Sequence, residues 1–320
     1  MKSIFGVLIA VALTTHVAYV AHAQQYPTKP VRVIVPFAPG GGTDISARQF
    51  SQKLSEAFKH QFVVDNRGGA GGMIGIEMAV KAPADGYTLM MMSASYSATS
   101  ALHKPAWDPI KAIMPVAEFG ATPFVLVVHP SVKASSAKEL IALAASKPNL
   151  LTFASTGTGS ITHLATELIM YMTKTQMVHV PYKSTGAALT DVLSGQAPVL
   201  MGSLLPVVPH MQSGKLRGLA VTTAKRWYSL PDVPTLNDTV PGYVVELWHG
   251  TMAPAGTPQP VINALNAAIN RAMETPEMKR NLEQQGMIPT GGTPARFGER
   301  IATDYNNWLK VVKAANIKVN

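Results

Sequence analysis

The sequence contains no cysteine among its 320 residues. This absence excludes a disulfide-stapled scaffold, a thiolate zinc site, an iron–sulfur cluster, a cysteine nucleophile and a lipid anchor on cysteine. Charged residues are scarce, at 14% of the chain, whereas hydrophobic residues make up 47%. This balance excludes a disordered chain or an acidic tail protein. Lys and Arg exceed Asp and Glu by 27 to 18, but no basic run concentrates them, so we expect no nucleic-acid partner.

Catalytic and metal-binding motifs are missing as well. The chain has no Gly-x-Ser-x-Gly elbow, no Walker loop and no His-Glu-x-x-His pair. No two histidines are spaced as metal ligands on one helix would be, and no obvious acid–base pair of carboxylates stands out. We therefore predict a protein that is not an enzyme and that uses no metal or cofactor. The alternative is an exported α/β hydrolase, for which Ser160 and His163 are the one candidate pair.

Long apolar runs are confined to the N-terminus. Lys2 is the only charge in the first 23 residues, an apolar stretch follows from Ile4 to Leu13, and Ala21-His22-Ala23 offers a small-x-small cleavage site. This pattern predicts a signal peptide over residues 1–23, cleaved near Ala23. A retained membrane anchor is the weaker alternative, because a span needs about 20 apolar residues. Export without cysteine favours a soluble monomer in a bacterial periplasm.

Short β-rich runs alternate with helical patterns over most of the remaining chain. Strands are predicted at 31–35, 62–64, 87–92, 124–128, 151–154, 177–180 and 199–201, with helices at 44–58, 73–80, 137–145, 160–172 and 187–193. This alternation is typical of βαβ units and predicts an α/β fold with mainly parallel sheets covered on both faces. At about 150 residues per domain, the length suggests two domains.

The C-terminal tail has a different, all-helical pattern. Three helices are predicted at 258–273, 276–285 and 294–315, each with a proline in its first turn. Thr257, Thr275 and Thr293 precede these prolines and are predicted to cap the helices. A helical tail after a βα region suggests that the chain returns to its first lobe and wraps it.

The strongest chemical feature is the loop Pro36-Phe37-Ala38-Pro39-Gly40-Gly41-Gly42-Thr43-Asp44, between a predicted strand and a predicted helix. Consecutive glycines let the backbone approach a ligand closely. The first N–H groups of a helix lack intrahelical partners and carry partial positive charge, so they suit a carboxylate or phosphate. The alternative is a tight turn capped by Thr43 or Asp44.

A second loop, Ala154-Ser155-Thr156-Gly157-Thr158-Gly159-Ser160, has the same design and adds hydroxyl groups. It is a poor dinucleotide fingerprint, because Thr162 replaces the third glycine. Two such loops in separate halves of the chain predict two lobes that hold one anion between them. We expect valine at either Gly41 or Gly159 to reduce binding more than stability.

Three further features are weaker. Gly68–Gly72 is more typical of a turn than of a site, and His163 is as consistent with a capping or core role as with a ligand contact. Ser93-Ala94-Ser95-Tyr96-Ser97 offers hydroxyls, Ser93 first, at the sheet edge where open α/β proteins bind ligands.

The first loop resembles the signature of the periplasmic substrate-binding receptors of tripartite tricarboxylate transporters, the Bug family. The resemblance covers essentially all of the chain after the signal peptide. It continues, in order, through the segments 64–72, 84–89, 179–183, 188–196, 214–217 and 253–258.

The resemblance implies a two-lobed periplasmic binding protein fold, type II-like, with two crossovers. Lobe 1 is expected to comprise 26–125 plus 247–320, and lobe 2 to comprise 126–246. The implied function is capture of a small organic carboxylate between the lobes and its delivery to the integral membrane subunits of the transporter, with sensing as an alternative use. The family's carboxylate contacts carry over to Phe37, Gly41, Thr43, Asp44, Thr156, Gly159 and Ser160.

The chain departs from its relatives in the second lobe. Gly202 and Ser203 stand where many relatives have a Phe-Asp pair, which predicts a roomier and less acidic wall with Ser203 in the site. An ammonium group on the ligand would lack a partner there, unless Asp44 faces the pocket. We therefore expect a carboxylate without an α-amino group, either a di- or tricarboxylate or an aromatic acid. Phe37 and Tyr96 are candidates to pack on its apolar body.

Overall fold

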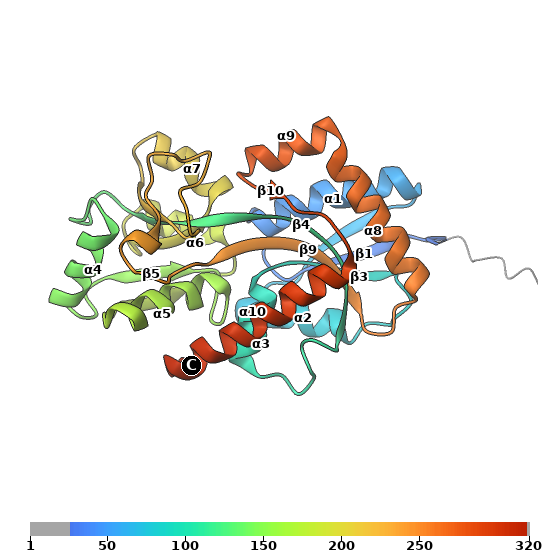
Figure 1. Ribbon diagram of the computed structural model, residues 1–320, viewed down its shortest axis with the longest axis horizontal. Coiled ribbons are helices and arrows are strands. Elements are labelled where there is room, and N and C mark those ends of the chain that lie inside the picture. The colour runs from blue at the N-terminus through green and yellow to red at the C-terminus, as the bar shows by residue number, and fades with distance from the viewer. Residues whose placement is uncertain (1–25, 319–320) are drawn as a thin grey trace, which may run out of the picture.

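The computed structural model describes residues 26–318, so the predicted signal peptide lies outside the described residues. The chain folds into two α/β lobes that lie side by side along the long axis of the molecule (Figure 1). In lobe 1 the strand order is β2-β1-β3-β9-β4, with β10 also paired to β4, and in lobe 2 it is β6-β5-β7-β4, with β8 also paired to β4. The strands of lobe 1 are β1 (Val31–Val35), β2 (Phe62–Asn66), β3 (Thr88–Ser93), β9 (Glu246–Pro254) and β10 (Ile288–Pro289). Those of lobe 2 are β5 (Thr152–Ser155), β6 (Val178–Pro181), β7 (Val199–Ser203) and β8 (Arg217–Val221), while β4 (Ile113–Val128) runs through both lobes.

Helices cover the sheets of both lobes. Lobe 1 carries α1 (Gly42–Phe58), α2 (Met73–Val80), α3 (Ser95–His103), α8 (Gln259–Glu274), α9 (Pro276–Gln284) and α10 (Pro294–Ala314). Lobe 2 carries α4 (Ala137–Ser146), α5 (Ile161–Thr173), α6 (Thr185–Leu193) and α7 (Leu204–Gln212). Short 3-10 turns occur at Ala70–Gly72 and Leu236–Asp238.

Two chain crossings connect the lobes. Residues up to Pro123 of β4 pair with β9, whereas Phe124 onward pairs with β7 and β8. On the return, the Val245 N–H donates to the Thr222 carbonyl of lobe 2, and the next residue begins β9. The lobe boundaries expected at 125–126 and 246–247 stay a prediction.

The sheets are mixed, and the prediction of mainly parallel sheets is wrong for their central strands. β1 pairs in parallel with β2 and β3, and β5 pairs in parallel with β6 and β7. β4, by contrast, runs antiparallel to β7, β8, β9 and β10. Pro115, Gly120 and Pro123 lie inside β4, and they obscured its 16-residue length in the sequence.

The first strand shows why the sheet is buried on both faces. Val31, Val33 and Val35 join one hydrophobic core with α1 and α8, while Ile34 joins the other with α3 and α10. Successive side chains of a strand point to opposite faces, so a continuous apolar run supplies two cores at once.

The C-terminal helices confirm two of the three predicted caps. The Thr275 and Thr293 hydroxyls accept hydrogen bonds from the N–H groups of Met278 and Arg296. The prediction for Thr257 is wrong, because its hydroxyl donates to the Pro254 carbonyl and Pro258 occupies the capping position.

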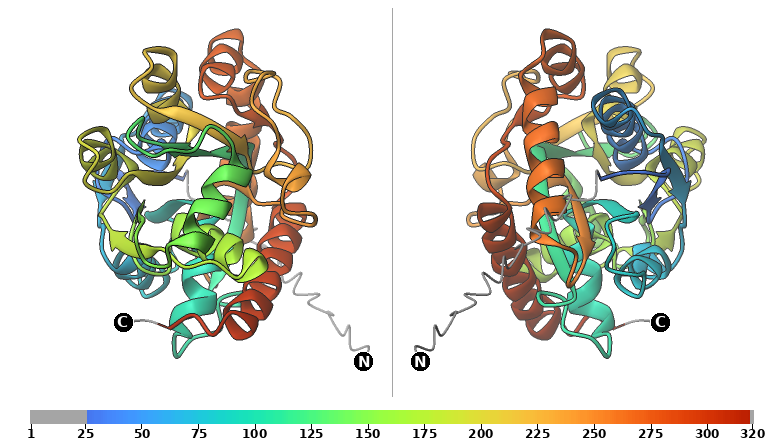
Figure 2. Two further views of the ribbon diagram at one scale, coloured as in Figure 1. Left: turned by 90° about the vertical axis from the view of Figure 1, so that its left-hand side faces the viewer. Right: turned by 90° about the vertical axis from the view of Figure 1, so that its right-hand side faces the viewer.

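The last helix was expected to belong to lobe 1 alone, but it also reaches lobe 2. α10 packs on α3 in lobe 1, and its end lies against α5 of lobe 2, where Trp308 and Val311 face Ile161 and Leu168 across a shared hollow (Figures 1 and 2). The tail therefore bridges the lobes instead of wrapping only the first. Across residues 26–318, no helix combines the length and apolar character that crossing a membrane requires.

Candidate functional site

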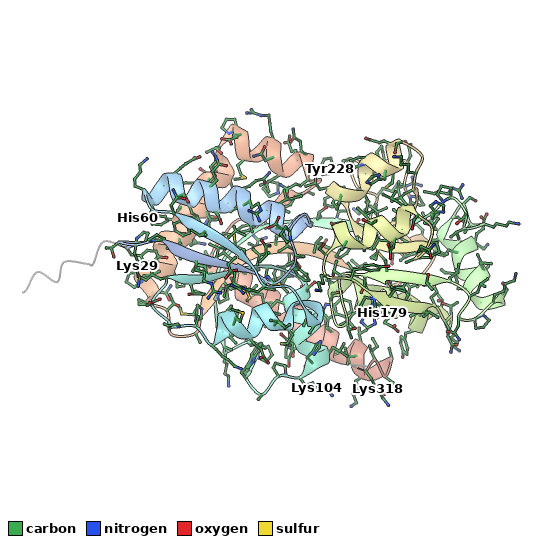
Figure 3. The ribbon with its side chains drawn as sticks, turned by 180° about the vertical axis from the view of Figure 1, so that it is seen from behind. Lys29, His60, Lys104, His179, Tyr228 and Lys318 are labelled. Carbon is green, nitrogen blue, oxygen red and sulfur yellow. The ribbon has the colours of Figure 1, made fainter. Side chains whose placement is uncertain are left out.

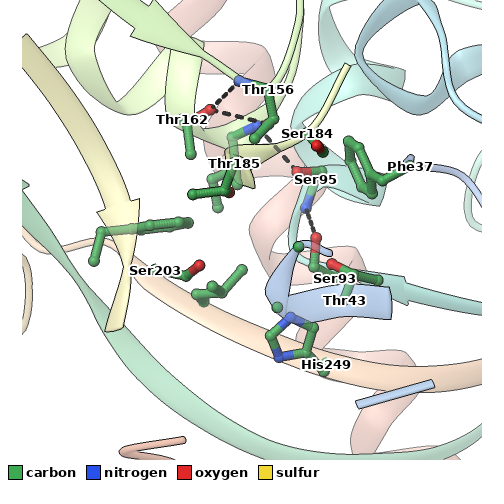
Figure 4. Close-up of a pocket in the computed structure, with 15 residues that line it drawn as sticks. Phe37, Thr43, Ser93, Ser95, Thr156, Thr162, Ser184, Thr185, Ser203 and His249 are labelled. Carbon is green, nitrogen blue, oxygen red and sulfur yellow. Dashed lines mark hydrogen bonds between the residues drawn. The ribbon is translucent and has the colours of Figure 1, made fainter. Parts of the chain in front are cut away.

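A cavity lies between the two lobes, and the space free of protein atoms within and in front of it, open solvent included, is about 380 Å³. Its lining consists of Phe37, Gly41, Gly42, Thr43, Ser93, Ser95, Phe124, Thr156, Ile161, Thr162, Ser184, Thr185, Ser203, Leu247 and His249 (Figure 4). Eight of these residues carry hydroxyl groups. Among residues 26–318, no Asp, Glu, Lys or Arg belongs to this lining.

Five helices begin at the cavity. Residues at or beside the start of α1, α3, α5, α6 and α7 all contribute to its lining. The first turn of each helix has N–H groups without intrahelical partners and a partial positive charge of the helix dipole. The sequence predicted two such helix starts, and the fold brings five to one place. The cavity is therefore electrostatically suited to an anion although the lining from residues 26–318 contains no Lys or Arg.

The first loop reaches the cavity through Phe37, Gly41 and Thr43. Gly41 caps α1 with an ordinary φ of −88°, so its backbone conformation does not demand glycine. A Cβ at this position would meet only Ser184 Cβ and the Thr185 nitrogen, both 3.9 Å away across the lobe interface. The absence of a side chain at Gly41 thus leaves room beside the start of α6.

Asp44 is buried beside the loop but is not part of the cavity lining. Its Oδ2 accepts from the Gly40 N–H at 3.1 Å, its Oδ1 accepts from Asn66 Nδ2 at 2.9 Å, and Arg48 donates to it as well. Burial favours the neutral acid, but these donors outweigh it and hold the pKa of Asp44 below its usual value. Of the two roles open at the sequence level, the structure shows Asp44 tying the loop to α1.

In the second loop, Thr156 lines the cavity whereas Gly159 and Ser160 do not. A Cβ on Gly159, whose φ is +83°, would lie 2.8 Å from His103 Nε2 in lobe 1. The Ser160 hydroxyl caps α5 through the His163 N–H and contacts Thr162 Oγ1 at 3.0 Å. The structure thus gives these two residues a packing and capping role behind the cavity wall.

Ser93 and Ser203 both line the cavity. Gly202 does not widen it, because a Cβ there would collide with Val207 Cγ1 inside lobe 2. Tyr96 is fully buried away from the lining and donates its hydroxyl to the Pro109 carbonyl. Of the two aromatic residues considered for the ligand's apolar body, only Phe37 is in position.

Sequence reasoning missed several lining residues. Ser184 and Thr185 belong to a third strand-to-helix loop, and Leu247 and His249 lie on β9. The Lys183-Ser184-Thr185-Gly186 segment after a predicted strand was a usable signal. No signal in the sequence placed His249 at the site, because β9 reaches the site only by pairing with β3 and β4.

The candidate hydrolase pair is not assembled. The Ser160 hydroxyl does not contact the His163 imidazole, whose Nδ1 accepts from the Gly159 N–H and whose Nε2 lies 3.4 Å from Glu167. His163 stacks on His179 of lobe 2, which Figure 3 shows near Lys318. His163 therefore belongs to a buried structural cluster. Within the described residues, no group of three or more His, Asp or Glu is placed to hold a metal ion.

The lobes touch each other around the cavity. The Ala38 N–H donates to the Lys183 carbonyl, the Ile161 N–H donates to Ser95 Oγ, and Thr99 Oγ1 donates to the Gly159 carbonyl. These bonds join lobe 1 groups to lobe 2 groups. The structure is thus that of a molecule whose lobes are closed on one another.

Comparison with known proteins agrees with this architecture. Residues 46–317 match the family described as "Tripartite tricarboxylate transporter family receptor". The chain belongs to this family. It is 35% identical to Protein BugT of Bordetella pertussis over 323 residues, covering 100% of this chain and 98% of BugT. The receptor also superposes on a solved periplasmic transporter with a TM-score of 0.87 and 39% identity, covering 92% of this chain and 100% of that one.

A third relative carries a ligand. An R. palustris protein solved with adipate has a TM-score of 0.86 and 35% identity to this receptor, covering 92% of this chain and 99% of that one. The receptor is thus a solute-binding protein of the Bug family with the periplasmic binding protein fold, and its structural neighbours are binding proteins.

Proposed function

We propose that this receptor captures a small organic carboxylate in the cavity between its lobes and delivers it to the integral membrane subunits of a tripartite tricarboxylate transporter. The observation that carries the proposal is the convergence of five helix starts on one cavity lined by hydroxyl groups. This environment stabilises an anion through backbone dipoles.

The same lining disfavours other charge types. An α-ammonium group would need a negatively charged hydrogen-bond acceptor. The nearby carboxylate of Asp44 is already paired with Arg48. A phosphate would lack the bidentate arginine contacts that such ligands often use, since the lining drawn from residues 26–318 contains none. We therefore infer a carboxylate without an α-amino group. The site residues we propose are those that line the cavity.

The class of carboxylate follows from the apolar part of the lining. Phe37, Phe124, Ile161 and Leu247 provide an apolar surface that suits a short hydrocarbon body. Adipate in the R. palustris relative is a ligand of this kind. We favour an aliphatic dicarboxylate over an aromatic acid, because Tyr96 does not reach the cavity.

Thermal-shift screening of carboxylic acids tests this proposal, because a ligand at 100 times its Kd adds about 2.7 kcal/mol of stability. We expect succinate, glutarate or adipate to raise the melting temperature, and aspartate and inorganic phosphate to leave it unchanged. Calorimetry of succinate against aspartate then measures the discrimination. A preference for aspartate would contradict the charge-type argument, and no response to any acid would contradict the proposed function.

We also propose export, periplasmic location and a monomeric state, on the signal-peptide pattern and the family of the chain. N-terminal sequencing of the protein from a periplasmic extract should begin at Gln24, and light scattering should give the mass of one chain. Loss of dicarboxylate uptake in a deletion strain would support transport, whereas normal uptake with a lost response to the acid would favour sensing. Absence of ester turnover by the purified receptor would support binding without catalysis.

A further inference from the structure

One end of the cavity holds polar atoms that nothing in the protein uses. Ser203 Oγ and both imidazole nitrogens of His249 are buried and find no hydrogen-bond partner within residues 26–318. The two side chains are 5% and 3% exposed. Both line the cavity, on the lobe 2 and lobe 1 sides respectively. Buried polar atoms normally have partners, and leaving one unpaired is destabilising.

His249 and Ser203 lie apart from Thr156 and Thr162 of lobe 2. In Figure 4 Thr156 and Thr162 occupy the upper end of the pocket, while His249 lies at the lower end with Ser203 and Thr43 above it. A Cβ on Gly42 would lie 3.3 Å from Ser203 Oγ and 3.9 Å from His249 Cε1, which places both side chains close to the start of α1. In the same view Ser93, Ser95, Ser184 and Thr185 lie between these groups, so hydroxyl groups line the pocket from the Thr156 end to the His249 end.

Charged groups near His249 on β9 lie on the other face of the sheet. Glu246 and Gly250 lie at positions that alternate with His249 along β9, so they face the opposite side of the sheet from the His249 side chain. On that opposite face Arg300 of α10 pairs with Glu246 and Glu118, and Asp304 of α10 accepts from Trp248 Nε1.

On the cavity face, the neighbours are uncharged. β3 contributes Ser93, β4 contributes Gly120, and β7 contributes Ser203. The acid of α1, Asp44, is turned to Arg48 and Asn66. Burial alone lowers the pKa of His249 to about 4, so its imidazole is neutral at neutral pH.

We propose that the receptor binds a dicarboxylic acid together with one proton, with one carboxylate held by the helix starts and the second carboxyl group held by His249 and Ser203. This inference rests on the proposed function, and it names the ligand class and the residues that select it.

Charge balance supports the uptake of a proton. Helix starts provide partial charges suited to one carboxylate, but a second buried carboxylate faces no Lys or Arg in the lining formed by the described residues. A neutral imidazole has one N–H donor and one acceptor nitrogen, and a protonated carboxyl group has the complementary acceptor and donor. The proton belongs to the pair, whether it resides on the imidazole or on the acid. The receptor therefore binds one dianion and one proton, and no other species takes part in the equilibrium.

Calorimetry counts that proton directly. Binding heats of adipate, glutarate and succinate are measured at pH 7.5 in phosphate and in Tris, whose ionisation heats differ, and hexanoate serves as the matched acid with one carboxylate. We expect uptake of about one proton with the dicarboxylate that binds most tightly, and none with hexanoate. The affinity for that dicarboxylate should fall by close to tenfold per pH unit between about pH 6.5 and 8.

The variant His249→Phe tests the assignment to this residue. We expect it to lose proton uptake and the preference for the dicarboxylate over hexanoate. Its melting temperature without ligand should not fall, because two unpaired buried nitrogens are replaced by apolar atoms. His210→Phe, on α7 outside the cavity, is the matched control and should bind as the unmodified receptor does.

The outcomes separate the two proposals. Tight binding of a dicarboxylate without proton uptake, or proton uptake that persists in His249→Phe, would overturn this inference and leave the receptor function intact. Failure of every carboxylate to bind would overturn the proposed function itself. The proton count of the unmodified receptor decides the matter even if the variant folds poorly.

Discussion

At the scale of single residues, the surroundings of a glycine decide its role. Gly41 and Gly159 occupy equivalent places in two similar loops of the sequence. A side chain at Gly41 would extend toward open space at the lobe interface, but one at Gly159 would strike His103. The φ of +83° at Gly159 adds backbone strain for any other residue. The two positions, which the sequence led us to treat alike, are expected to respond differently to the same substitution.

We expect Gly41→Val to lower carboxylate affinity by at least about tenfold, because its branches fill space beside the start of α6, with little change in stability. Gly159→Val should instead lower the melting temperature, since left-handed strain alone costs about 1–3 kcal/mol. Calorimetry and thermal unfolding of both variants measure the difference. Equal stability losses would show that the loops are equivalent after all.

Asp44 gives a prediction about acid stability. Its pKa is held low in the folded state, so the ionised carboxylate contributes stability above the unfolded pKa of about 4, and the contribution is lost as pH falls through the folded value. Asp44→Asn should be less stable than the unmodified protein at pH 7, and the gap should shrink as pH falls below about 4. Denaturant unfolding at pH 7, 5 and 3.5 measures it. A constant gap would contradict a charge-based role.

At the scale of elements, the site consists mainly of helix starts. α1, α5 and α6 each begin with a strand-to-helix loop whose residues line the cavity, and the strands end at the same edge of their sheets. Open α/β sheets bind ligands at such edges because the helix dipoles point there. A change in charge at one helix start should therefore act on ligand and helix in opposite directions.

Thr43→Asp places a negative charge in the first turn of α1, at a residue that lines the cavity. The charge favours the helix by about 0.3–1 kcal/mol but repels a carboxylate. We expect unchanged or slightly higher thermal stability and loss of binding. Thr43→Asn, of the same shape without the charge, should keep most of the affinity. Similar affinities for the two variants would argue against a bound anion near α1.

At the scale of the whole molecule, contacts across the lobes maintain the closed arrangement. Gly71 of lobe 1 packs so closely against the second loop that a Cβ at this position would overlap the Thr158 carbonyl oxygen. Its neighbour Gly69 also has a positive φ, but a Cβ there would meet only Ile74 of its own lobe. Neither glycine lines the cavity. Substitutions at Gly71 and Gly69 therefore test lobe closure without changing a residue that lines the cavity.

We expect Gly71→Ala to hinder closure and to weaken carboxylate binding, because the added methyl group forces the loops apart. Gly69→Ala should disturb its own turn but allow closure. Small-angle scattering with and without a saturating carboxylate measures the change in radius of gyration. Ligand-induced compaction that is as large in Gly71→Ala as in Gly69→Ala would show that this contact does not limit closure.

Local pattern alone determined much of this protein. Apolar runs such as Val31–Val35, glycine-rich loops and threonine–proline helix starts specify strands, turns and caps through short-range sterics and hydrogen bonds, and they carry the resemblance to the family. The local pattern predicted the two loops, and the resemblance implied Phe37, Gly41, Thr43 and Thr156 within them. All four line the cavity, because a strand-to-helix loop brings its own residues to the sheet edge.

Only the tertiary structure decided the rest of the site. His249 comes to the cavity through antiparallel pairing of β9 with strands more than 120 residues earlier in the chain, which no local pattern encodes. Asp44, Gly159 and Ser160 share the loops that line the cavity, yet their side chains or hydrogen atoms are directed to Arg48, His103 and Thr162. Sequence fixes which groups a loop contains, whereas packing between distant segments determines which of them face the ligand.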